Sequence, residues 1–144
     1  MKRFEKKVVR QPRGPMIMSA LGQFKADLVL KNANVLNVFT KEFMPRDVAI
    51  NGDTIIGIGE YQGALEYDFS GKYIVPGFID AHVHIESSML VPQAFAREVV
   101  RRGTTTLIAD PHEIANVCGE PGIQFMLDAA EKSPVNLYYM VIIA

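Results

Sequence analysis

Short apolar runs separated by turn-forming residues occupy the first half of the chain. Two of these runs, at 26–31 and 35–39, predict short β-strands, and a second pair, at 48–50 and 54–58, flanks Gly52. Glycine adopts the positive φ angles of tight turns, so the second pair predicts a β-hairpin. This half of the chain therefore predicts a small β-domain, comparable to half of a sandwich.

From residue 73 onward, longer apolar runs alternate with segments of helical period. The predicted order is strand, helix, strand, helix, strand, at 73–84, 92–102, 104–109, 122–132 and 135–144. A Pro76-Gly77 turn breaks the first strand, and a loop is expected at 110–113. Parallel strands joined by helices predict a right-handed α/β sheet or barrel. Three strands cannot close an eight-stranded barrel, so the sheet is either small and open or part of a longer fold.

Composition and charge exclude several classes of partner. The 144 residues are 49 % hydrophobic and 22 % charged, and the net charge of −1 favours neither nucleic acid nor an anionic membrane. Basic residues gather only near the start, where they predict a solvated tail or first helix. Cys118 is the single cysteine, which excludes an intrachain disulfide. No apolar stretch approaches the ~20 residues of a membrane span, so we expect a cytoplasmic protein.

Two histidines end the apolar segment at 78–84. Side chains alternate across a strand, so His82 and His84 lie on one face and Val83 lies on the other. The strand rise separates the two histidine Cα atoms by ~7 Å, from which both rings reach one metal ion at ~2.0–2.1 Å. Active sites of α/β folds lie at this end of the strands. We predict that His82 and His84 bind a metal; the alternative is two hydrogen-bonded core or loop histidines.

A polar segment, Glu86-Ser87-Ser88, follows the histidines directly. A carboxylate in this position would bind a polar edge of a substrate or orient a ligand histidine. The alternative is a solvated loop whose serines prepare the start of the next helix. Position alone does not separate the two interpretations.

A second polar segment, with Asp110, His112 and Glu113, follows the next predicted strand. Three ionisable groups at that end of the strand would face the same mouth as the histidine pair. They would hold an auxiliary metal, bind substrate, or make hydrogen bonds to the metal ligands. The alternative is a turn in which Asp110 caps the following segment. We favour a functional loop, because polar loops on this face commonly carry function.

Three stretches of the chain resemble one enzyme family. Residues 75–84 resemble the first barrel strand of the amidohydrolase superfamily, and the β-rich segment before them resembles its small N-terminal domain. Residues 82–89 and 109–117 are similar to the adenine deaminase branch of that superfamily. The resemblance covers about residues 25–144.

The resemblance implies an α/β fold in which a small β-sandwich-like domain precedes the first β/α units of a metal-dependent hydrolase TIM barrel. Only part of that barrel lies in this chain. The expected segments are a basic tail or helix at 1–24, a composite β-domain without its partner strands at 25–72, and the start of the (β/α)8 barrel at 73–144.

The implied reaction is hydrolytic deamination of adenine to hypoxanthine and ammonia, in purine salvage. A divalent metal held by His82 and His84, manganese first with iron or zinc as alternatives, would activate the attacking water. A carboxylate would move the protons. The active-site candidates are Glu86, Asp110, His112 and Glu113, and the substrate-binding candidates are Glu86, Ser87 and Ser88. The implied partner is adenine, without nucleic acid or membrane, and the full-length protein is expected to be a homo-oligomer.

The chain departs from the family pattern in two ways. Val91 stands before the helix-opening proline, where the family usually has Thr or Ser, so a helix cap worth about 1 kcal/mol is missing. The family's later metal ligands and its main catalytic carboxylate lie on strands beyond residue 144. We therefore expect the 144-residue chain alone to be inactive and poorly soluble.

Two other interpretations stay open. One is another cyclic-amidohydrolase activity, dihydroorotase-like or deacetylase-like, although the segments at 86–88 and 110–113 count against it. The other is an inactive truncated remnant or a binding module. Downstream DNA that encodes the missing barrel strands would separate a truncated gene from a short native protein.

Overall fold

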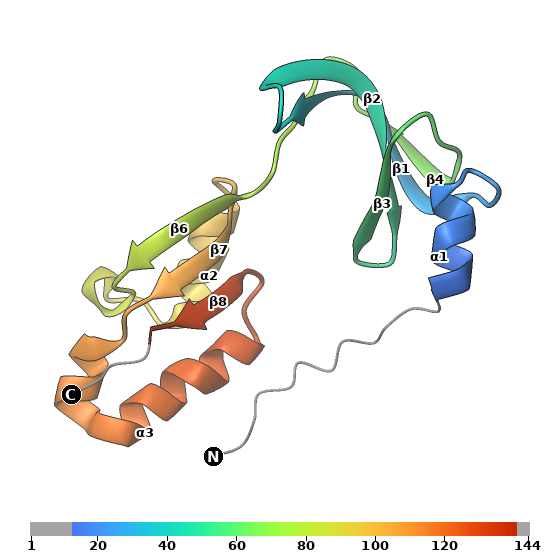
Figure 1. The fold of residues 1–144 in the computed structure, drawn as a ribbon. Helices are drawn as coiled ribbons and strands as arrows, with labels where there is room; N and C mark the ends of the chain where they lie inside the picture. The colour runs from blue at the N-terminus through green and yellow to red at the C-terminus, as the bar shows by residue number, and fades with distance from the viewer. Residues whose placement is uncertain (1–12, 141–144) are drawn as a thin grey trace. The chain divides into compact units, whose positions relative to one another are not determined.

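The structure, a computed structural model, describes residues 13–140 (Figure 1). The chain forms two compact units, Met1–Val75 and Pro76–Ala144, and each has its own sheet. Part of the predicted basic tail, residues 1–12, and the end of the last predicted strand, residues 141–144, lie outside the described residues.

The first unit combines a short helix with a five-stranded sheet. Its elements are α1 (Arg13–Ala20), β1 (Ala26–Asn37), β2 (Glu42–Asn51), β3 (Thr54–Gly59), β4 (Gly63–Asp68) and β5 (Tyr73–Ile74). The strand order is β3-β2-β1-β4, and β5 also pairs with β1. Strand β2 is antiparallel to both neighbours, whereas β4 and β5 run parallel to β1. Within the described residues of this unit there is one sheet, so the second layer of the predicted sandwich stays a prediction.

Turn residues determine how these strands follow one another. The predicted hairpin is confirmed: β2 and β3 meet at Gly52, whose φ of 57° lies in the left-handed region. The Gly52 N–H donates to Asp27 Oδ2 at 2.9 Å, which ties the turn to β1. The prediction of two strands at 26–31 and 35–39 was wrong, because one strand, β1, runs through both segments and ends at Asn37. Asn32, with a φ of 60°, takes up an irregularity in register without ending the strand.

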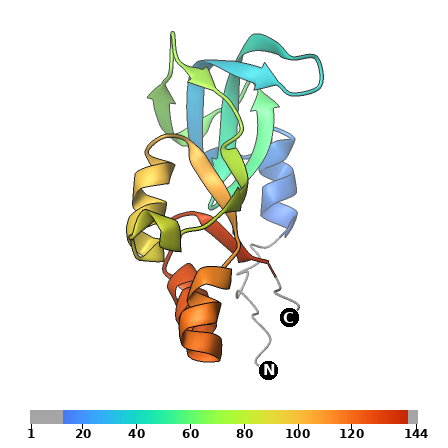
Figure 2. The ribbon, with the colours of Figure 1, turned by 90° about the vertical axis from the view of Figure 1, so that its left-hand side faces the viewer.

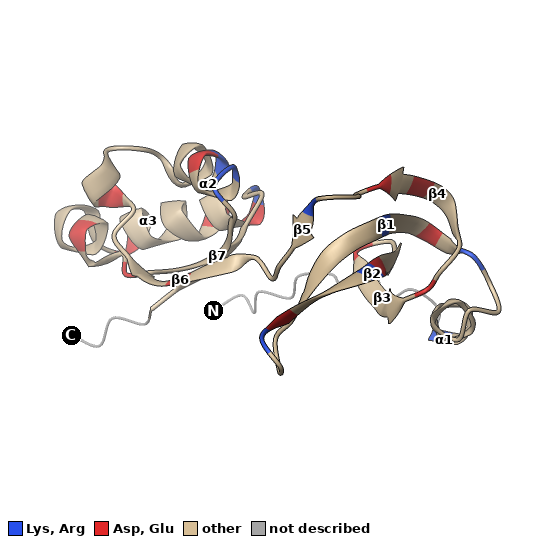
Figure 3. Cartoon of the chain, turned by 90° about the horizontal axis from the view of Figure 1, so that it is seen from above, with Lys and Arg blue, Asp and Glu red and all other residues tan. Residues whose placement is uncertain are grey.

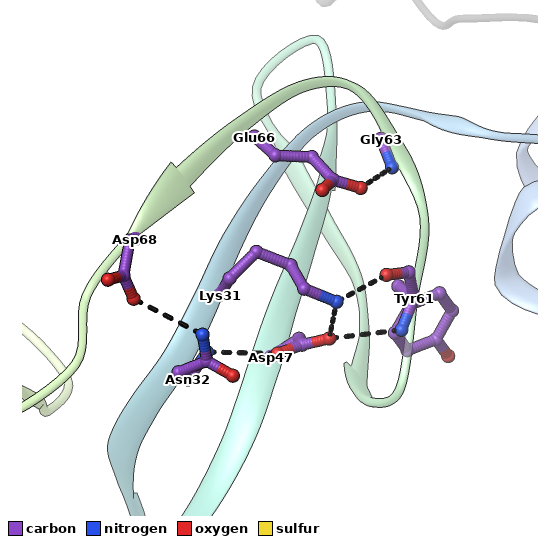
Figure 4. Close-up of polar contacts among 7 residues, drawn as sticks. All are labelled: Lys31, Asn32, Asp47, Tyr61, Gly63, Glu66 and Asp68. Atoms are coloured by element: carbon purple, nitrogen blue, oxygen red, sulfur yellow. Dashed lines mark hydrogen bonds and ion pairs between the residues drawn. The ribbon is translucent and has the colours of Figure 1, made fainter.

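A charged pair joins the two central strands of this sheet (Figure 4). Lys31 on β1 forms an ion pair with Asp47 on β2, and Lys31 Nζ also donates to the carbonyl of Tyr61 at 2.9 Å. Asp47 accepts two further hydrogen bonds, from the backbone N–H of Asn32 at 3.0 Å and of Tyr61 at 3.2 Å. Burial raises the pKa of Asp47, but these donors together outweigh it and hold the pKa below its usual value.

The second unit confirms the predicted β-α-β-α-β order and its parallel strands. Its elements are β6 (Phe78–Val83), the 3-10 helix η1 (Glu86–Ser88), α2 (Pro92–Val100), β7 (Thr104–Ala109), α3 (His112–Glu131) and β8 (Asn136–Tyr139). The strands lie in the order β6-β7-β8, and α2 and α3 cover one face of this sheet (Figures 1 and 2). Leu107 and Ala109 on β7 are fully buried beneath the two helices, with Phe95 and Met126 packed nearby.

The predicted break of the strand over 73–84 at Pro76-Gly77 is confirmed, but its two parts belong to different sheets and not to one strand. The segment Tyr73–Ile74 pairs with β1 in the sheet of the first unit, and β6 begins only at Phe78. Pro76 has no backbone N–H to donate to a sheet. A side chain at Gly77 would clash, since an added Cβ would lie 2.1 Å from Thr105 Oγ1. The Pro-Gly pair therefore separates two strands of different sheets.

Helix α3 begins at His112 rather than at residue 122 as predicted, so His112 and Glu113 lie in a helical turn and not in a loop. The helix is kinked at Gly119, which has φ 59° and ψ −146°, two residues before Pro121. The sequence signals that predicted a helix start mark this kink instead.

Basic residues of the second unit lie near the end of α2, close to an acidic residue of the same helix (Figure 3). Glu98 Oε1 lies 3.8 Å from Arg101 Nη1, and Glu98 Oε2 lies 3.4 Å from Arg102 Nη1. All three side chains are exposed. Exposed pairs of this kind contribute little to stability. Among the described residues, no helix combines the length and apolar character needed to cross a bilayer.

Candidate metal centre

The two predicted ligands lie where β6 ends. His82 is within β6 and His84 follows its last residue, and their Nε2 atoms are 3.2 Å apart. His84 Nδ1 lies 3.1 Å from the backbone oxygen of Asp110. A carbonyl oxygen only accepts hydrogen bonds, so His84 Nδ1 carries the proton and Nε2 of the neutral ring presents a lone pair to His82.

This arrangement suits a cation between the two rings. Two neutral imidazoles with both Nε2 lone pairs turned together repel each other, unless a proton or a metal ion lies between them. Metal-ligating histidines typically donate their other ring N–H to a carbonyl or carboxylate, as His84 does. Imidazole nitrogens with nearby carboxylates are a donor set for zinc, iron or manganese. His82 and His84 therefore fit the predicted metal.

The structure brings the residues after β7 to the same place. Asp110 Oδ2 lies 3.2 Å from His112 Nδ1, and the rings of His84 and His112 meet edge to face with centroids 4.7 Å apart. The potential ligand atoms form two overlapping groups, and the atoms of each group all lie within 4.8 Å of one another. One contains His82, His84 and Asp110, and the other contains His84, His112 and Glu113.

The segment after β6 contacts the first turn of α3. Glu86 Oε1 accepts a hydrogen bond from the Ile114 N–H at 3.3 Å, while Glu86 Oε2 is buried without a hydrogen-bond partner among the described residues. The Ser87 hydroxyl donates to Glu113 Oε1 at 2.6 Å. The Ser88 hydroxyl instead donates to the backbone oxygen of Ile85 at 2.6 Å, which stabilises η1 locally. Ser87 thus contacts a carboxylate of the histidine cluster, Glu86 contacts the backbone beside that carboxylate, and Ser88 contacts neither.

Tyr139, near the end of β8, was missed by the sequence analysis. Its hydroxyl donates to the carbonyl of Met126 at 2.8 Å. Burial, and after it the negative charge of Glu86, raises the pKa of Tyr139 far above its usual value. Tyr139 packs against the core cluster of Ile85, Ala109 and Met126 and bonds to α3, and no local sequence signal indicated this contact.

Comparison with known proteins finds one matching family model and several similar relatives. Residues 73–142 match the model of the amidohydrolase family. The adenine deaminase of Clostridium acetobutylicum is 58 % identical over 125 residues, which are 87 % of this chain and 22 % of that protein. Adenine deaminase 2 of Carboxydothermus hydrogenoformans is 53 % identical over 131 residues, which are 91 % of this chain and 23 % of the relative. The chain thus spans about a fifth of the length of the curated relatives it matches.

Solved structures support the same fold. A D-aminoacylase studied for its binuclear metal centre superposes with a TM-score of 0.61 at 23 % identity, over 81 % of this chain and 29 % of that one. The N-acyl-D-glutamate deacylase of Bordetella bronchiseptica, in complex with zinc and a phosphonate inhibitor, gives a TM-score of 0.50 at 25 % identity. That match covers 60 % of this chain and 19 % of the deacylase. This chain therefore shares its fold with the matching parts of these two proteins.

Proposed function

We infer that this chain belongs to the amidohydrolase family and is the amino-terminal part of an enzyme that hydrolyses adenine to hypoxanthine and ammonia. The observation that carries the proposal is the identity of 50–58 % with several adenine deaminases, over 81–91 % of this chain. The geometry at the end of β6 and β7 agrees with it, because imidazoles and carboxylates converge there.

We propose His82 and His84 as the ligands of a divalent cation, with manganese as the first candidate and iron and zinc as alternatives. When bound, the cation supplies the Lewis acidity that makes water a nucleophile at neutral pH. The Asp110 carbonyl supports this assignment, because it fixes the tautomer in which His84 presents its Nε2 lone pair. The full set of ligands requires residues outside this chain.

The carboxylates of Glu86 and Glu113 are the proposed groups for binding adenine and moving protons, with Asp110 and His112 as further active-site members. Deamination needs a proton on the purine ring and another on the departing amine. Glu86 Oε2 is buried and has no donor among the described residues, and this unsatisfied acceptor beside the cluster supports a role for Glu86. Ser87 and Ser88 stay substrate-binding candidates from the sequence; the main catalytic carboxylate would lie beyond residue 144.

The test is turnover by the full-length protein loaded with Mn²⁺. We expect release of one ammonia per adenine consumed, and no activity on dihydroorotate or on N-acyl-D-amino acids. Hydrolysis of either alternative substrate, without turnover of adenine, would overturn the proposal in favour of another amidohydrolase activity. Cytoplasmic location and homo-oligomerisation of the full-length protein stay predictions from the sequence.

A further inference from the structure

A short hydrogen bond ties together the two segments that follow β6 and β7. Ser87 Oγ, in η1, donates to Glu113 Oε1, in the first turn of α3, at 2.6 Å. Bonds from a hydroxyl to a carboxylate of this length are at the strong end of the range. The two residues are 26 positions apart, so the bond depends on the packing of two separate β/α units.

The surroundings of this bond hold both partners in place. The neighbour of Ser87, Glu86, accepts the backbone N–H of Ile114, the residue after Glu113. Pro111, at the entrance to α3, is fully buried, and Ile114 packs against the core that contains Ile85. The backbones of both segments are therefore fixed independently of Ser87, and the hydroxyl acts on the Glu113 side chain alone.

The bond determines which oxygen of Glu113 is free. Ser87 occupies Oε1, whereas the carboxylate as a whole belongs to the group of ligand atoms shared with His84 and His112. Glutamate has several rotatable bonds, so a half-buried Glu113 without this partner would populate other rotamers. A carboxylate held beside His84 favours a cation at the histidine pair by direct attraction.

We propose that Ser87 is a positioning residue, which holds the Glu113 carboxylate against the histidine cluster and thereby strengthens cation binding and catalysis there. The part of this inference that concerns catalysis rests on the proposed function, because it needs adenine as the substrate. The part that concerns cation binding does not. Ser87 itself acts through Glu113 and needs no contact with the reacting atoms.

A double-mutant cycle on the full-length protein tests the proposal, with Ser87→Ala, Glu113→Gln and the double variant. We expect Ser87→Ala to weaken Mn²⁺ binding by about tenfold and to lower kcat for adenine by about tenfold. KM should change less than kcat. In the Glu113→Gln background the same change has an effect of less than about twofold, because the negative charge that Ser87 positions is already lost. Ser87→Thr keeps the hydroxyl and restores most of both quantities.

The matched control is Ser70→Ala in the first unit, which removes an equally short bond from a serine hydroxyl to Asp68 at 2.6 Å. It should leave Mn²⁺ affinity and kcat unchanged. Equal effects of Ser87→Ala in the wild-type and Glu113→Gln backgrounds, or no rescue by threonine, would overturn the proposal. Mn²⁺ affinity is measured without substrate, so a protein that binds Mn²⁺ as expected but ignores adenine would refute the proposed function and not the role of Ser87.

Discussion

At the scale of the residue, the proposed metal centre depends on how one imidazole is held. The backbone oxygen of Asp110 fixes the proton of His84 on Nδ1, and His82 approaches from the other side with its Nε2 at 3.2 Å. His82 is exposed and His84 is half-buried, so a cation can reach the pair from solvent. Substitution of either histidine should therefore change the binding of a cation directly.

We predict that His84→Ala and His82→Ala each lower the affinity of the full-length protein for Mn²⁺ by more than about a hundredfold. Removing a metal ligand weakens metal binding more than removing a residue that only orients a ligand. Calorimetric titration of the metal-free protein measures this. His112→Ala should have a smaller effect, since His112 Nδ1 is paired with Asp110. Unchanged Mn²⁺ affinity in the His84 variant would contradict the assignment.

The histidine pair could be predicted from the sequence, but the group that orients it could not. Two histidines two positions apart on an apolar strand already share a face, which is a local property of any strand. Every residue has a backbone carbonyl, so nothing in the sequence distinguishes that of Asp110. Its position comes from the pairing of β6 with β7, in which the Asp110 N–H also bonds to the Val83 carbonyl at 3.0 Å.

At the scale of the element, α3 differs most from its prediction. Pro111, Asn116, Val117 and Cys118 are poor helix formers, and Gly119 and Pro121 resemble a boundary. Tertiary packing outweighs these preferences, because Ile114 contacts the core cluster of Ile85, Ala109 and Met126. By contrast, β7 was predicted correctly because its β-branched run needs no tertiary information.

We predict that Gly119→Ala destabilises the full-length protein by about 1–3 kcal/mol, because φ 59° with ψ −146° is accessible almost only to glycine. Nothing lies within 4 Å of the added Cβ, so the loss would come from backbone strain rather than from a clash. Gly14→Ala in α1 is the control, since its Cβ also enters open space but in a helical conformation. Urea unfolding measures both, and equal stabilities of the two variants would contradict the strain.

The ion pair between β1 and β2 predicts a pH dependence. The pKa of Asp47 is lower in the folded state than its ordinary value of 3.8, so its contribution to stability is full above that value. The contribution is lost as the pH falls through the lower, folded-state pKa. Asp47→Asn should therefore cost about 1.5–3 kcal/mol at pH 7, and its difference from the wild type should shrink below about pH 4. Urea midpoints across this pH range test the sign.

At the scale of the whole molecule, the sheet of the second unit has no partner on β6 beyond β7 among the described residues. Phe78 and Ile79 on this strand are 61 % and 65 % exposed. An apolar strand with an open edge pairs readily with other chains. No local sequence signal states which segment covers such an edge, so the rest of the fold could not be predicted from these residues.

We predict that a purified chain of residues 1–144 aggregates and shows no adenine turnover with added Mn²⁺. Light scattering and an ammonia assay measure the two properties. Ile79→Lys should reduce the aggregation, because a charge on an edge strand opposes pairing. A monomeric chain that releases ammonia from adenine would contradict both expectations.

The kink at Gly119 divides α3 into two parts that do not share one continuous ladder of backbone hydrogen bonds. Helical cooperativity is passed along such a ladder, so the turn that carries His112 and Glu113 can fray while the later turns stay intact. Deuterium uptake should then show two populations of amides in this helix. The ordering of His112 and Glu113, near the proposed metal site, would thus depend more on the contacts made by Glu86 and Ser87 than on the rest of the helix.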